Sequence, residues 1–158
     1  MGTKRVGWAR IRSLINENTN QLKMSRKKVD NSTFNTGAAV TATLTAAQGG
    51  THFNIDGTGD IVVNLPALSA DNVGLSYSFM VTTAVGGSKT VTFVLPGSSV
   101  SNFYAERLDY ATGSYPRLAT SGDTLTLGNS SVVGSRVELL CIADDGTNST
   151  WQAYIASD

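Results

Sequence analysis

The sequence Leu-Ser-Tyr-Ser-Phe-Met-Val-Thr-Thr, residues 75–83, alternates apolar and polar side chains more clearly than any other stretch of the chain. The apolar members of the alternation are Leu75, Tyr77, Phe79 and Val81. A period of two is typical of a β-strand with one face buried and the other exposed. The stretch therefore predicts a strand that turns its serines away from the core.

Shorter segments with the same character, bounded by Gly, Pro or Asp, follow one another through the rest of the chain. The further predicted strands cover residues 40–45, 51–55, 61–65, 90–95, 123–127, 136–143 and 151–155. Gly86-Gly87 indicates a hairpin between two of them, and residues 96–120 have no period and are predicted to be irregular. Since no helical segment separates the strands, we predict an all-β fold for residues 40–158, an antiparallel β-sandwich or jelly roll.

The composition agrees with this fold class. Of 158 residues, 36 are Ser or Thr and 16 are Gly, while charged residues make up 15%, against roughly 25% in an ordinary soluble domain. Thr and the β-branched apolar residues suit a pleated surface, and Gly supplies turns. No apolar run approaches the ~18 residues of a membrane-spanning helix, so we expect no membrane partner.

The net charge of zero conceals a division between the two ends of the chain. Residues 1–30 carry a net charge of +6 and the remaining residues carry −6. Within the basic segment Trp8, Ile11, Ile15 and Leu22 recur at helical spacing, which predicts a short amphipathic helix. Such a helix is marginally stable alone in water, so it needs a surface to lie on. We therefore divide the chain into a basic arm (1–30), a polar linker (31–39) and a β body (40–158).

Residues able to carry chemistry are few and scattered. His52 is the only histidine and Cys141 the only cysteine, and they are far apart in the sequence. One imidazole does not supply the usual ligand set of a zinc site, and Cys141 lies within an apolar run where a buried thiol is expected. We expect no catalytic residues, no cofactor and no bound metal.

Two acidic loops and one aromatic region leave alternatives open. Residues 56–60 and 144–148 are rich in Asp and Gly, and they fit turns better than a calcium loop. The aromatic residues of the irregular region are Phe103, Tyr104, Tyr110 and Tyr115. We expect them to close the end of the sandwich or to pack between subunits, and a carbohydrate-binding loop is the alternative.

Several short motifs resemble those of structural proteins from marine, cyanophage-like tailed bacteriophages. The opening Met1-Gly2-Thr3-Lys4-Arg5-Val6-Gly7 with its basic helix is similar to the start of such proteins. The body motifs are Leu65-Pro66-Ala67, Gly74-Leu75-Ser76-Tyr77-Ser78-Phe79, Val133-Gly134-Ser135-Arg136-Val137-Glu138-Leu139, Asp145-Gly146-Thr147-Asn148 and Trp151. They resemble modules of capsid decoration (cement) proteins, head fibres and tail fibres.

This resemblance implies a β-sandwich protein, often a homotrimer, on the exterior of the virion. We expect a decoration protein that binds the major capsid protein through its arm, since an inserted Trp among arginines has the composition of an interface anchor. The expected capsid-binding residues are Lys4, Arg5, Trp8, Arg10, Ile11, Arg12, Ile15, Arg26, Lys27 and Lys28. The alternative is a fibre or receptor-binding module that recognises a host surface glycan. An internal role on nucleic acid is disfavoured, because the arm lacks a dense basic tract and the body is acidic.

Overall fold

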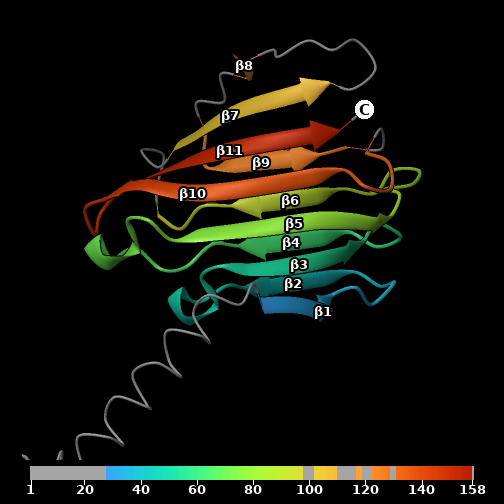
Figure 1. Ribbon diagram of the computed structural model, residues 1–158, viewed down its shortest axis with the longest axis horizontal. Coiled ribbons are helices and arrows are strands. Elements are labelled where there is room, and N and C mark those ends of the chain that lie inside the picture. Colours follow the sequence, from blue (N-terminus) through green and yellow to red (C-terminus); the bar gives the residue numbers. More distant parts are fainter. Residues whose placement is uncertain (1–27, 98–101, 110–116, 119–121, 129–130, 158) are drawn as a thin grey trace, which may run out of the picture.

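The structure, a computed structural model, describes residues 28–97, 102–109, 117–118, 122–128 and 131–157. These residues form eleven strands and two short 3-10 helices (Figure 1). The strands are β1 (Lys28–Phe34), β2 (Val40–Thr43), β3 (Thr51–Asp56), β4 (Ile61–Asn64), β5 (Ser76–Thr83), β6 (Val91–Val94), β7 (Asn102–Asp109), β8 (Arg117–Leu118), β9 (Thr124–Leu127), β10 (Arg136–Asp144) and β11 (Ser149–Ser157). The 3-10 helices are η1 (Ala46–Gln48) and η2 (Ala70–Asn72).

The strands build two sheets. The seven-stranded sheet has the order β1-β3-β5-β10-β11-β7-β8, and the four-stranded sheet has the order β2-β4-β6-β9. Figure 1 shows the strands of both sheets lying nearly along one common axis, with arrows that point both ways along it. The prediction of an all-β fold is confirmed for the described residues.

The strand directions differ from the predicted antiparallel arrangement. The first six strands alternate between the sheets, so that β1, β3 and β5 are parallel neighbours in one sheet, and β2, β4 and β6 are parallel neighbours in the other. Parallel neighbours need a crossover connection, and here each crossover is a strand of the facing sheet. The path is that of a two-sheeted β-solenoid, and the predicted antiparallel pairing is wrong for this half of the body, whereas its two sheets agree with a β-sandwich.

The C-terminal strands close this solenoid with antiparallel neighbours. β10 pairs antiparallel with β5, and β9 pairs antiparallel with β6. β11 then returns antiparallel along β10, as predicted, and β7 adds to it in parallel. β10 and β9 thereby extend the two sheets beyond the third solenoid turn with strands of reversed direction, whereas β11 and β7 run in the direction of β5 again.

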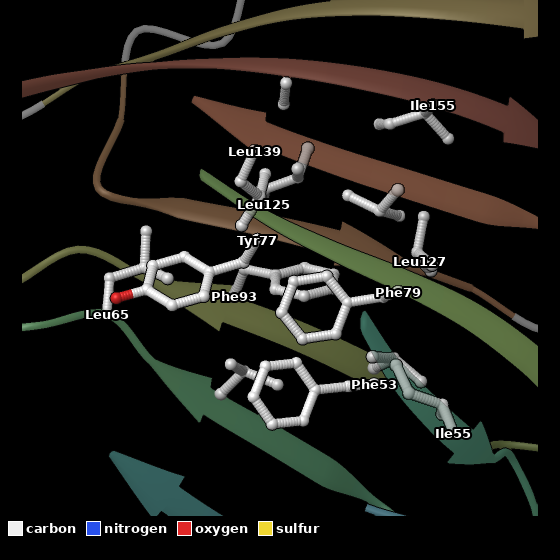
Figure 2. Packing of buried hydrophobic residues seen from close by; sticks show 14 of the residues in the cluster. Phe53, Ile55, Leu65, Tyr77, Phe79, Phe93, Leu125, Leu127, Leu139 and Ile155 are labelled. Atoms are coloured by element: carbon white, nitrogen blue, oxygen red, sulfur yellow. The ribbon is translucent and has the colours of Figure 1, made fainter. Parts of the chain in front are cut away.

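One hydrophobic core lies between the sheets. Phe53 and Phe79, which are in register on β3 and β5, stack with ring centroids 5.4 Å apart. Phe93 of β6 meets Phe79 from the other sheet, edge to face at 4.8 Å. Figure 2 shows these three side chains pointing toward one another from the two sheets. Tyr77 and Trp151 stack farther along the same core, with centroids 5.9 Å apart.

Residues 28–30 of the predicted arm and residues 31–34 of the predicted linker belong to strand β1. Asp30 accepts hydrogen bonds from the backbone N–H groups of Ser32 and Thr33, and a register shift between Asp30 and Phe34 places Phe34 opposite Ile55. Phe34 is fully buried against Phe53, with centroids 5.5 Å apart. The polar residues around Phe34 hid this strand, since a single inward aromatic side chain gives no period.

Two further expectations about the strands are corrected. Gly86-Gly87 does not form a hairpin between two hydrogen-bonded strands. It lies between β5 and β6, which belong to different sheets, so the chain passes here from one sheet to the other. The region predicted to be irregular contains β7, whose Phe103 and Ala105 are buried. β7 lies near one edge of the seven-stranded sheet. Its exposed and charged residues therefore interrupt the alternation of apolar and polar side chains that would have predicted a strand.

Close backbone approach explains the glycines of the turn between β3 and β4. A Cβ on Gly59 would lie 2.3 Å from the carbonyl carbon and oxygen of Ala38. A Cβ on Gly57 would lie 2.6 Å from the carbonyl oxygen of Thr83, which accepts the Gly57 N–H at 2.9 Å. Only a residue without a side chain allows successive solenoid turns to meet this closely.

Replacing Gly59 tests this contact. We expect Gly59→Ala to lower the free energy of unfolding by about 1–3 kcal/mol, the usual cost of overpacking, because the methyl group would meet the Ala38 backbone. Urea unfolding followed by circular dichroism measures the change. Gly86→Ala is the matched control, since its Cβ would meet no atom within 4 Å, and it should shift stability by less than about 1 kcal/mol. Equal stabilities of the two variants would contradict the close approach.

Candidate functional site

The outer face of the seven-stranded sheet carries exposed apolar and polar side chains together. Its exposed large side chains include Tyr104 (61% exposed), Tyr154 (45%) and Leu140 (36%). Because side chains alternate across a strand, these residues lie on the face opposite the core. An exposed face of this composition is a candidate binding surface.

The register of the strands arranges these side chains in rows across the sheet. The middle row runs through His52, Ser78, Glu138, Tyr154 and Glu106 on five neighbouring strands. A flanking row consists of Ser76, Leu140, Gln152 and Tyr104. On the other side Asn54, Met80, Arg136 and Ala156 form a third row.

Two hollows interrupt this face where short side chains stand between taller ones. The first hollow, of about 290 Å³, lies over Ser76 and Ser78 of β5. The second, of about 320 Å³, lies over Ala156 of β11. Glu138 and Tyr154 line both hollows, and they are direct partners in the β10–β11 register. The two hollows therefore adjoin, with this pair between them.

Hydrogen bonds on the face hold two of its polar side chains in place. The Gln152 amide donates to the hydroxyl of Tyr154, two residues along the same strand. His52 Nδ1 lies 2.8 Å from Ser78 Oγ, across the β3–β5 pair. The phenol and the serine hydroxyl are thus oriented, while the Glu138 carboxylate is exposed beside them. This arrangement can bind a polar ligand through hydroxyl, amide and carboxylate groups.

Carboxylates outnumber basic groups on the face that forms the two hollows. Glu106, Glu138 and Arg136 point outward, whereas Arg107 is the register partner of the inward Ile155, so its side chain lies on the other side of the sheet. Glu106 makes further interactions of its own. A ligand without negative charge fits such a surface better than an acidic one.

Sequence reasoning placed the candidate aromatic site elsewhere. Of the four aromatic residues of the predicted irregular region, Phe103 is buried in the core and Tyr104 is exposed on the outer face. Tyr110 and Tyr115 lie outside the described residues. A signal for the outer face was present in residues 136–143, where Leu140 and Ile142 occupy positions opposite the inward Val137, Leu139 and Cys141.

Nearly all the predicted capsid-binding residues lie outside the described part of the chain. This applies to Lys4, Arg5, Trp8, Arg10, Ile11, Arg12, Ile15, Arg26 and Lys27. Lys28 is described; it is exposed at the start of β1, the strand at one edge of the seven-stranded sheet.

The acidic loops use their carboxylates within the turns. Asp56 accepts from the N–H and hydroxyl of Thr58, and Asp145 accepts from the N–H groups of Thr147 and Asn148. These backbone hydrogen bonds, Asn148 first, lower the pKa of Asp145. Among the described residues no group of three or more His, Cys, Asp or Glu side chains is placed to hold a metal ion. Asp56 and Asp145 thus stabilise their own turns, which agrees with the Asp-Gly composition of these loops.

Cys141 is part of the core. Its thiol is buried, and burial followed by the nearby Asp144 raises the pKa of Cys141 to about 11. Tyr77 beside it donates a 2.9 Å hydrogen bond to the Thr45 carbonyl, and burial raises the pKa of Tyr77 to about 12. A thiol that stays protonated is a poor nucleophile, so Cys141 has a packing role.

Comparison of the chain with protein-family models, with curated proteins and with solved structures gave no match. No helix in the described part of the chain is long and apolar enough to cross a membrane.

The raised pKa values of Cys141 and Tyr77 predict a loss of stability in alkali. Both groups hold their protons more tightly when folded than when unfolded, where their pKa values are the ordinary 9.0 and 10.0. Their contribution is complete below about pH 9 and decreases as the pH rises through the folded values of about 11 and 12. Urea unfolding at a series of pH values measures this slope.

Cys141→Ala isolates the thiol from the other groups that titrate in alkali. The difference in unfolding free energy between the unaltered chain and the variant should be constant below about pH 9 and shrink above it, because only the unaltered chain has the thiol. A difference that does not change with pH would contradict the raised pKa of Cys141.

Proposed function

We propose that this protein is a structural virion protein, a capsid decoration protein that binds the outer surface of a phage head through its N-terminal arm. The division of charge carries the proposal: residues 1–30 have a net charge of +6 and the rest of the chain −6. A basic segment on an acidic body favours a separate electrostatic partner for that segment. The phage-like motifs of the arm and body support the choice of a capsid as this partner.

The place where the arm meets the body supports this division of roles. β1 is the edge strand of the seven-stranded sheet, and buried Phe34 holds its end in the core. The basic residues up to Lys27 directly precede this strand. A firmly anchored edge strand would transmit attachment at the arm to the whole body.

In this proposal the arm is an amphipathic helix that inserts between capsid subunits. Trp8, Ile11 and Ile15 would form its apolar stripe, and the basic residues around them would meet acidic groups on the major capsid protein. Aromatic side chains with surrounding arginines are typical of the energetically important centre of interfaces. The β body would then cover the capsid exterior as a homotrimer.

Removing the arm tests the proposal. Deletion of residues 1–27, which spares β1, should leave the body folded and abolish binding to capsids assembled without this protein, because the apolar stripe and the charge are both lost. Cosedimentation with such capsids counts the bound copies. If the chain without residues 1–27 still saturates the capsid, the body and not the arm makes the attachment. If the unaltered protein is present at only a few copies per virion, a fibre is favoured over a decoration protein.

Two smaller changes separate the contributions within the arm. Replacing Arg10 and Arg12 by Gln should slow association and weaken its salt dependence, as loss of rim charges does. Trp8→Ala should mainly speed release, with a loss of about 2 kcal/mol for a central anchor. Stopped-flow mixing measures the association rate, and dilution measures the dissociation rate. If each variant changed both rates by the same factor, the assigned roles would be contradicted.

The trimer is tested by placing a charge on the outer face of the four-stranded sheet. The outward side chains of this face are uncharged: Thr41, Thr43, Val62, Asn64, Thr92, Val94, Thr124 and Thr126. Interface cores are depleted of charge, so Val62→Glu should convert a trimer into single chains in light scattering. Ser88→Glu, in an exposed turn, is the control. A single-chain mass for the unaltered protein would contradict the trimer.

A further inference from the structure

We propose that the two adjoining hollows on the outer face of the seven-stranded sheet form a binding site for an uncharged oligosaccharide. The site is made by β5, β10, β11 and β7, and Tyr154 and Glu138 stand at its centre. This activity belongs to the β body and does not depend on how the arm is attached. The proposed attachment of the arm to the capsid involves no residue of the outer face of the seven-stranded sheet, and sugar binding assigns a function to that face.

The shape of the site favours a ligand with more than one unit. The hollows measure about 290 Å³ and 320 Å³ and share Glu138 and Tyr154 as a common wall. Each hollow alone is about as large as the smallest sites for a drug-sized ligand, which measure roughly 300–1,000 Å³, and together they lie well within that range. A chain of sugar units could place one unit on each side of the Tyr154 ring.

The chemistry of the lining fits sugar hydroxyls and sugar rings. Ser76, Ser78 and the Glu138 carboxylate offer hydrogen-bonding groups beside the first hollow, and the Tyr154 ring offers an apolar face. Few well-placed polar groups around an aromatic and apolar surface are the usual composition of a small-molecule site. A sugar ring has the matching character, with hydroxyls at its edge and C–H groups on its faces.

The aromatic wall is held in position before any ligand arrives. The Gln152 amide donates to the Tyr154 hydroxyl, and the neighbouring residues Ala153 and Ile155 are buried in the core. The backbone under Tyr154 is paired on both sides, with β10 and with β7. Preorganisation of this kind reduces the entropy lost on binding.

The charges that point outward decide between classes of ligand. The carboxylates of Glu106 and Glu138 outnumber the one outward guanidinium group, that of Arg136, so an acidic ligand is disfavoured by the overall field. A sulfated or sialylated sugar would place its charge beside Glu138. The geometry therefore points to neutral sugars.

The experiment uses the full chain and an array of short neutral gluco-, galacto- and manno-oligosaccharides beside sialylated and sulfated ones. We expect binding to at least one neutral probe. Tyr154→Ala should weaken that binding by at least about tenfold, as truncation of an aromatic anchor does. Tyr154→Phe, which keeps the ring and loses the hydroxyl, should lose less.

Filling each hollow provides a test that leaves Tyr154 and Glu138 unchanged. Ser76→Trp would occupy the first hollow, and Ala156→Trp would occupy the second, since both residues line them. Each variant should weaken binding of a probe that spans both hollows. Tyr104→Ala is the matched control: it removes an exposed tyrosine from the same face that lines neither hollow, and binding should stay within about twofold.

Four results would overturn the proposal. The first two are that no neutral probe binds, or that only acidic probes bind. The third is that a neutral probe binds equally well to Tyr154→Ala, Ser76→Trp, Ala156→Trp and the unaltered chain. The fourth is that Tyr154→Ala changes the molecular mass measured by light scattering. The last result would identify the face as a contact between copies of the chain. Circular dichroism of each variant shows that the body is folded, so a loss of binding is not a loss of structure.

Discussion

The contact between Phe79 and Phe93 joins the two sheets, and much of the fold depends on it. The two rings come from β5 and β6 and meet edge to face at 4.8 Å, in the middle of one continuous core (Figure 2). Phe53 and Phe34 extend this contact along the seven-stranded sheet, one from each earlier solenoid turn. Aromatic rings bury a large area and have preferred mutual geometries, so this series fixes how successive turns stack and why β1 belongs to the body.

Strand alternation lets the same strands build the core and the candidate site. On β11 Ala153 and Ile155 point into the core, and Tyr154 between them points outward. The side chains of the site therefore stand on paired strands rather than on loops, and their spacing follows from the register of the sheet. A rigid base of this kind favours recognition by shape, since the side chains need little rearrangement.

The proposed functions divide the chain between its two charge classes. The basic arm would provide attachment, and the acidic, hydroxyl-rich body would face the surroundings. The exposed edge of β1 links them, because the last basic residues directly precede a strand that Phe34 secures. Attachment and sugar binding would then be separable activities, one located in the arm and the other on the outer face of the seven-stranded sheet.

Period-two alternation was enough to locate β5, β10 and most other strands of the body, though not β7 or β8, since burying one face of a strand leaves that pattern whatever its neighbours are. It could not assign the neighbours. Parallel and antiparallel pairs bury the same alternation, so Gly86-Gly87 indicated a hairpin where the chain passes between sheets. β1 gave no signal, because Phe34 alone faces the core among polar residues. The candidate site combines side chains of strands far apart in the sequence, such as Ser78, Glu138 and Tyr154. Only the tertiary register brings these into one row, because pairing between distant strands depends on packing that no local pattern records.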